Sequence, residues 1–108
     1  MEKYIVITTL SDDLEVITII KNKLLINHLV SSCQINEVIS TYWWNNDIVE
    51  AKEYCLKMRT KESLYEKVAS MIKEFHNYDI PEISYYEING SQEITKWIDY
   101  YTENKGEE

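Results

Sequence analysis

Apolar positions along this chain follow two spacings, one typical of strands and one typical of helices. Residues 4–10 form a β-branched, apolar run that predicts a buried strand. Apolar residues at three- and four-residue steps then predict an amphipathic helix, capped by Ser11 and ending near Asn27 or His28. Its apolar face consists of Leu14, Ile17, Ile20 and Leu24.

A long hairpin is predicted next. Residues 29–44 are rich in strand formers but exceed the length of an average strand, so we expect a bend or bulge near Asn36 and Glu37. Residues 45–47 (Asn-Asn-Asp) tolerate positive φ and predict the turn. The return strand covers residues 48–59, where residues suited to opposite faces alternate.

The second half of the chain repeats the order of helix and strand. Thr60 is expected to cap a helix that ends at His76, because Pro81 prevents its continuation. A strand over residues 82–88 and a last helix capped by Ser91 follow. The order β-α-β-β-α-β plus a C-terminal helix predicts an α+β, ferredoxin-like sandwich with an antiparallel sheet. Residues 1–108 should form one domain, with a frayed tail at residues 105–108.

Composition and charge exclude several classes of function. Hydrophobic residues make up 44% of the chain and charged residues 28%, as in an ordinary globular domain. The net charge of −8 leaves no clustered basic face, so we expect no nucleic-acid partner. No apolar stretch approaches a membrane span and no secretory signal is evident, so we expect no membrane partner and a cytoplasmic location.

No arrangement of residues in the sequence specifies a reaction. Gly90 and Gly106 are the only glycines, which excludes a glycine-rich phosphate loop, and no Ser-His-Asp order or nucleophile elbow is present. We therefore expect that the protein is not an enzyme.

Several short segments, in their order and spacing, resemble one family. The segment 29–35 is similar to its Leu-Ala-Ala-Cys-x-Asn-Ile string, and the segment 76–83 to its His-Pro-Tyr-Glu-Val-Pro-Glu-Ile string. Over residues 3–103 the chain resembles the CutA divalent-cation-tolerance family. Three positions depart from the pattern, because Glu37 and Asn46 each replace a usual glycine and Asn77 replaces a usual proline.

The resemblance implies a homotrimer in which long hairpin strands pair between subunits. It also implies a non-enzymatic module that binds a metal ion such as copper, or another small ligand, at clefts between subunits. The aromatic hairpin independently favours assembly, because a projecting arm with Tyr42, Trp43 and Trp44 would expose an apolar patch in a monomer. The alternative is a trimeric sensor of a small anion, similar to the PII signal proteins.

Candidate metal ligands are Cys33, His76 and Asp79. A cysteine thiolate and an imidazole suit Cu²⁺ or another divalent cation, but no paired Cys-x-x-Cys or His-x-x-x-His spacing supports them. The structural alternatives are a buried cysteine for Cys33 and turn chemistry for His76 and Asp79.

A second candidate set would form a ligand-binding cleft. Lys57 and Arg59 share one face near a strand end and, with Tyr78, could hold an anion, while Glu82 lies in the best-matching segment. The alternative is that both cations pair with nearby carboxylates.

Overall fold

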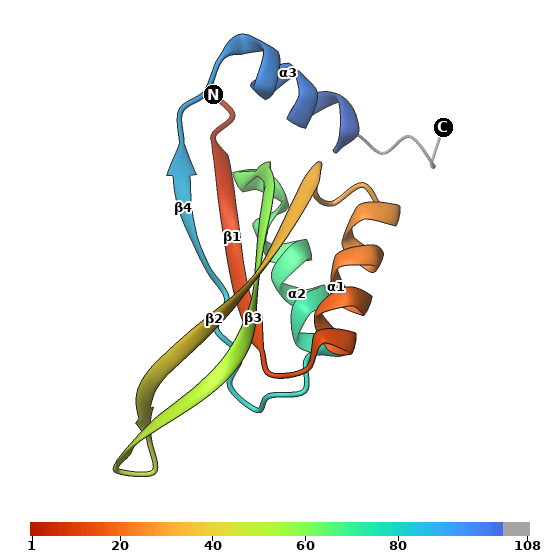
Figure 1. The fold of residues 1–108 in the computed structure, drawn as a ribbon. Helices are drawn as coiled ribbons and strands as arrows, with labels where there is room; N and C mark the ends of the chain where they lie inside the picture. The colour runs from red at the N-terminus through yellow and green to blue at the C-terminus, as the bar shows by residue number, and fades with distance from the viewer. Residues whose placement is uncertain (103–108) are drawn as a thin grey trace.

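The chain folds around a four-stranded antiparallel sheet with the strand order β2-β3-β1-β4 (Figure 1). The computed structural model describes residues 1–102, so the expected tail at 105–108 lies outside the described residues. In chain order the elements are β1 (Tyr4–Ser11), α1 (Leu14–Ile26), β2 (Ser32–Trp44), β3 (Asp47–Lys61), a 3-10 turn (Glu62–Leu64), α2 (Tyr65–Phe75), β4 (Ser84–Ile88) and α3 (Gln92–Tyr101). The predicted element order and α+β class are confirmed.

The hydrophobic core lies between one face of the sheet and helices α1 and α2 (Figure 1). Side chains alternate along a strand, so Ile5 and Ile7 of β1 share this face with Leu56 and Met58 of β3. All four are fully buried, as are the apolar residues that α1 and α2 direct at them: Ile17, Ile20, Leu24, Val68 and Ile72. The opposite face of the sheet is not covered by α1 or α2.

Helix α3 lies across the end of the sheet at which β1 begins (Figure 1). The hydroxyl of Tyr4 donates to both carboxylate oxygens of Asp99, at 2.9 and 3.0 Å, and this shared hydrogen bond connects α3 to β1. Ser91 caps the helix as predicted, because its Oγ accepts from the backbone N–H of Ile94 at 3.2 Å.

Strands β2 and β3 form a hairpin that extends beyond the helices and gives the molecule its long dimension of 47 Å (Figure 1). Asn45 and Asn46 form its two-residue turn with φ of 51° and 65°, the left-handed values of a type I′ turn. The register between the strands is continuous, so the predicted bulge near Asn36 and Glu37 is wrong. Glu37 instead forms an ion pair with Lys52, at 3.5 Å.

Two predicted helix caps are also wrong. Asp13 caps α1, since its carboxylate accepts from the N–H of Glu15 at 2.9 Å, whereas Ser11 ends β1. Thr60 belongs to β3, where its hydroxyl donates to the carbonyl of Leu29 at 2.6 Å. In both cases strand pairing with β1 or β3 extends the strand past the residue that could have capped the helix.

Candidate functional site: an acidic groove beside the hairpin

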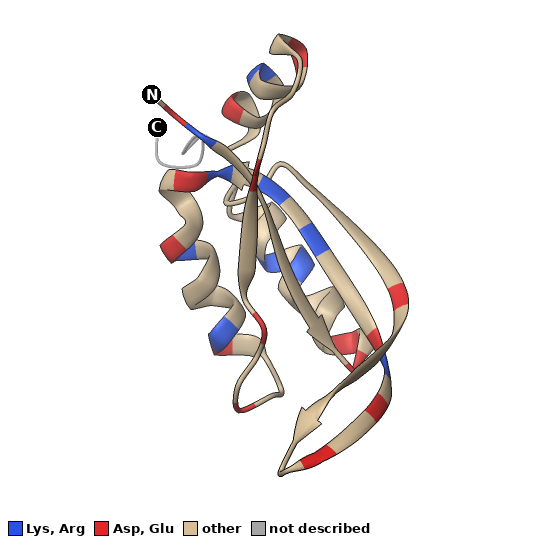
Figure 2. Ribbon diagram, turned by 90° about the vertical axis from the view of Figure 1, so that its left-hand side faces the viewer, with Lys and Arg blue, Asp and Glu red and all other residues tan. Residues whose placement is uncertain are grey.

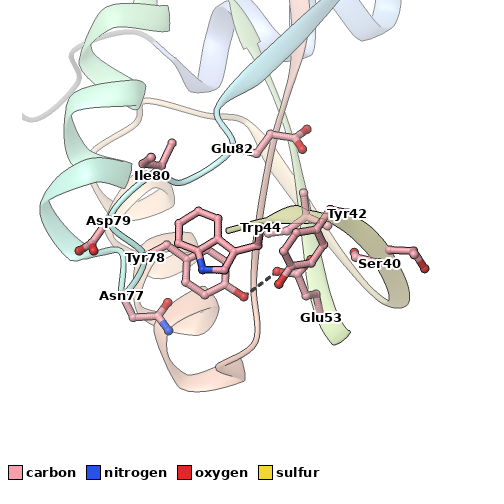
Figure 3. A pocket seen from close by; sticks show the side chains of 11 residues that line it. Ser40, Tyr42, Trp44, Glu53, Asn77, Tyr78, Asp79, Ile80 and Glu82 are labelled. Carbon is pink, nitrogen blue, oxygen red and sulfur yellow. Dashed lines mark hydrogen bonds between the residues drawn. The ribbon is translucent and has the colours of Figure 1, made fainter. Parts of the chain in front are cut away.

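A groove of about 640 Å³ lies between the β2–β3 hairpin and the loop that joins α2 to β4 (Figure 3). Three carboxylates line it, those of Glu53, Asp79 and Glu82. Its aromatic walls come from Tyr42, Trp44 and Tyr78. Among the residues that the structure describes, no lysine or arginine lines the groove, so its electrostatic character is acidic.

His76 positions the loop at the point where it leaves α2. Its Nε2 lies 2.8 Å from the carbonyl oxygen of Leu10, and its Nδ1 lies 3.1 Å from the backbone nitrogen of Tyr78. Because a carbonyl can only accept and an N–H can only donate, Nε2 carries the proton and Nδ1 accepts. Burial lowers the pKa of His76, although the Leu10 carbonyl and the nearby Glu53 and Asp12 partly oppose this shift.

Asn77 attaches the same loop to the end of β1. Its side-chain oxygen accepts from the hydroxyl of Ser11 at 2.6 Å, and its Nδ2 donates to the carboxylate of Asp12 at 2.9 Å. The Asn77 side chain therefore links the α2–β4 loop to the segment that joins β1 to α1, through hydrogen bonds to two side chains of that segment.

Tyr78 and Glu53 form the centre of the site (Figure 3). The Tyr78 hydroxyl donates to Glu53 Oε2 at 2.6 Å and accepts from the backbone N–H of Asp12 at 2.8 Å. Burial, followed by the bond to Glu53, raises the pKa of Tyr78 well above its usual value. Glu53 is only 6% exposed, although it is a carboxylate in a hairpin strand.

The structure brings part of the predicted cleft together. Tyr78 and Glu82 both line the groove, and Asp79, predicted as a metal ligand, lines it as well. Lys57 and Arg59 do not. They lie along β3 on the face that α1 and α2 leave uncovered, where Lys57 pairs with Thr8 and Arg59 with Val6.

The carboxylate partners considered for Lys57 and Arg59 are not found. Within the described part of the chain, the salt bridge between Lys52 and Glu37 is the only one. Both cations are half-buried between neighbouring strands.

The three predicted metal ligands do not form one cluster in the described part of the chain. Cys33 is half-buried on the helix-covered face of β2, opposite Met58, while Asp79 is exposed at the groove. Burial raises the pKa of the Cys33 thiol to about 11, which keeps it protonated at neutral pH. Across residues 1–102, no group of three or more His, Cys, Asp or Glu side chains is placed to hold a metal ion.

Sequence reasoning did not assign the other residues that line the groove, among them Glu53, Tyr42 and Trp44. The alternation along β3 places Glu53 on the uncovered face together with Cys55 and Lys57. What it does not reveal is the loop that reaches this position, because Tyr78 lies 25 residues further along the chain. Tyr42 and Trp44 share one face of β2, because side chains alternate along a strand. This alternation is the sequence pattern from which their proximity could have been predicted.

The fold and the groove define a small α+β protein with a ferredoxin-like sheet, a projecting hairpin and an acidic cleft beside the hairpin. None of the helices in the described residues is long and apolar enough to cross a membrane.

Comparison with known proteins identifies the family. The model of the family described as "CutA1 divalent ion tolerance protein" matches residues 4–100, and the chain belongs to this family. The divalent-cation tolerance protein CutA of Pyrococcus horikoshii is 30% identical over 95 residues, which cover 87% of this chain and 93% of that protein. A CutA homolog of Danio rerio is 47% identical over 58 residues, which cover 53% of this chain but only 39% of the zebrafish protein.

Solved structures agree on the fold. The crystal structure of CutA from Archaeoglobus fulgidus, described as a periplasmic divalent cation tolerance protein, superposes with a TM-score of 0.90. It is 28% identical, and the match covers 93% of this chain and 99% of that one. These comparisons give no support to the alternative of a PII-like sensor.

Proposed function

We propose that this protein is a non-enzymatic binding module that works as a homotrimer and holds a divalent cation, such as Cu²⁺, at clefts between its subunits. The observation that carries the proposal is the projecting hairpin, whose exposed apolar face ends beside a groove lined by carboxylates. Membership of a family described by divalent ion tolerance supports the choice of ligand. A cytoplasmic location remains part of the proposal.

Assembly would satisfy two features of the hairpin. Ile39, Trp43 and Ile48 share one of its faces and are 67%, 72% and 59% exposed. Strand β2 is an edge strand, so its outer backbone groups are open to pairing with another chain. Packing of a second subunit against the hairpin would cover the apolar face and pair the edge.

Asp79 and Glu82 are the available cation ligands among the predicted residues. Both are exposed at the groove, and carboxylate oxygens bind divalent cations in their ordinary charged state. His76 would have to release one of its two hydrogen bonds, and Cys33 would have to lose its proton, before either could bind. A neighbouring hairpin would bring further ligands to the exposed carboxylates.

The test is a calorimetric titration of Cu²⁺ into chelator-stripped protein, with light scattering on the same sample. We expect a trimer mass and saturable, stoichiometric binding. Asp79→Asn and Glu82→Gln should each weaken Cu²⁺ binding roughly ten-fold or more, as losses around metal sites do. Glu93→Gln, an exposed change on α3, is the matched control and should leave the affinity unchanged. A monomer mass, or weak binding without saturation, would refute the proposal.

A further inference from the structure

We propose that the interior of the groove binds a small organic ammonium cation, through the carboxylate of Glu53 and the aromatic faces of Tyr42 and Trp44. This inference goes beyond the divalent-cation proposal. All the residues that line this part of the groove belong to one subunit, and Glu53 is distinct from the carboxylates proposed to hold the divalent cation.

The size and lining of the groove suit a small molecule. Its volume of about 640 Å³ lies within the roughly 300–1,000 Å³ that is usual for small-molecule sites. Leu10 and Ile80 contribute apolar surface, and the aromatic side chains add to it (Figure 3). An alkyl-substituted cation would bury its carbon atoms against this surface, which a small hydrated metal ion could not do.

Glu53 supplies the charge that selects the ligand. Glu53 is only 6% exposed and it lines the groove. Oε2 accepts from the Tyr78 hydroxyl at 2.6 Å, whereas Oε1 has no hydrogen-bond partner within the described residues. Oε1 is open to solvent, because Thr9 Oγ1 is the only fully buried side-chain polar atom without a partner among the described residues. A cation that enters the groove could therefore replace water at Oε1 of a carboxylate that has one neutral donor.

The remaining lining favours a cation over an anion next to Glu53. The groove holds three carboxylates and, among the described residues, no lysine or arginine, so an anion would be repelled. Asp79 and Glu82 lie on different sides of the Tyr78 ring rather than converging on Glu53 (Figure 3). One buried carboxylate next to aromatic faces is the arrangement that recognises alkylammonium groups, because the negative face of the ring attracts a diffuse positive charge.

The probe is choline, compared with 3,3-dimethyl-1-butanol, which has the same shape but no charge. Binding is followed by calorimetry and by tryptophan fluorescence. We expect choline to bind saturably and its neutral isostere to bind at least about ten-fold more weakly, as loss of a desolvated cation–π and ionic contact implies. Choline is added as its chloride salt, and the neutral alcohol is added with an equal concentration of sodium chloride, so that chloride concentration and ionic strength are the same in both titrations.

Two pairs of variants locate the site. Glu53→Gln removes the charge with little change in shape and should weaken choline binding about ten-fold, as expected for a partly buried ionic contact. Glu50→Gln, on the opposite face of β3, should not. Trp44→Leu keeps an apolar side chain but removes the aromatic face and should weaken choline binding several-fold. Trp43→Leu, its neighbour on the opposite face of β2, is the matched control.

Several results would overturn the inference. Equal affinity for choline and its neutral isostere would exclude recognition of the charge. Equal losses in Trp44→Leu and Trp43→Leu would exclude this groove as the site, and this pair serves even if Glu53→Gln does not fold. Cu²⁺ binding that depends on Asp79, without any choline binding, would refute this inference and leave the proposed function intact. Choline binding without Cu²⁺ binding would do the reverse.

Discussion

The hydroxyl of Tyr78 has two different hydrogen-bonding roles. It accepts from the backbone of Asp12, at the start of the β1–α1 connection, and donates to Glu53 in β3. The hydroxyl can do both only while it is protonated, and its raised pKa keeps it protonated throughout the neutral range. A single side chain therefore joins the loop, the hairpin strand and the β1–α1 connection at the groove.

His76 predicts a loss of stability in mild acid. Its pKa is lowered in the folded protein, mainly by burial, so folding favours the neutral ring. This contribution to stability is present above the ordinary histidine pKa of about 6.5 and is lost as the pH falls through the lower folded value. Protonation would also remove the acceptor for the Tyr78 N–H.

The measurement is the free energy of unfolding in urea at several pH values between about 7.5 and about 5, on both sides of the ordinary histidine pKa. Other groups titrate in this range, so wild type is compared with His76→Gln, which cannot gain a proton. We expect the variant to be less stable at pH 7.5 but to lose less stability on acidification. If the free energy of unfolding changes with pH in the same way in both proteins, protonation of His76 is not the cause of the loss of stability.

The residues of the groove show where sequence reasoning reached its limit. The segment that contains His76, Tyr78 and Asp79 was recognisable from its resemblance to one family and lies at the groove. Glu53 was not recognised, because its burial depends on contact with a loop that the strand pattern cannot place. Asn77, where the family usually has proline, bonds to Ser11 and Asp12 across 66 and 65 residues of chain, and no local pattern reveals such pairs.

Among the elements, helices and strands were predictable and several of their ends were not. Apolar periodicity located α1, α2, α3 and the four strands because burial of one face decides both spacings. Helix starts depend instead on where strand pairing stops. Thr60 could cap a helix, but it is paired with Ile5 in the sheet, and the prediction therefore failed there. The bulge expected in β2 failed because the long strand twists without losing register.

The start of α3 depends on the absence of a side chain at Gly90. A Cβ at this position would collide with Cγ2 of Ile94, which branches directly from the Cβ of that residue and cannot easily move away. Gly90→Ala should therefore lower the free energy of unfolding by about 1–3 kcal/mol, the usual cost of overpacking. Urea unfolding of wild type and variant measures this change.

A double mutant separates the collision from other effects of the substitution. Ile94→Ala removes the clashing methyl group, so Gly90→Ala should cost much less in that background than in wild type. If the cost is the same in both backgrounds, the clash is not its cause. Gly90 precedes the N-cap Ser91 and its φ is not positive, so alanine would otherwise stabilise the protein slightly by restricting the unfolded chain, which would reduce any remaining cost.

At the scale of the whole molecule, repulsion between like charges opposes assembly, whereas burial of the apolar hairpin face favours it. Figure 2 shows that acidic residues predominate toward the turn of the hairpin, where residues 37–53 contain Glu37, Asp47, Glu50 and Glu53 but only one basic residue, Lys52. With a net charge of −8 on each chain, association brings like charges together. The apolar face of the hairpin must outweigh this repulsion, and added salt should help by screening it.

Trp43 provides the clearest test of this balance, because it is 72% exposed on the apolar face of the hairpin and does not line the groove. Trp43→Asp should weaken the proposed trimer by about 2 kcal/mol or more per contact, as loss of a central aromatic residue does at interfaces. Ile26→Asp is the control, since Ile26 is 75% exposed at the end of α1 and the substitution adds the same charge. Light scattering across a dilution series should show dissociation at higher concentration for Trp43→Asp than for Ile26→Asp. If the two variants dissociate alike, the added charge alone explains the effect, and the hairpin does not hold the subunits together.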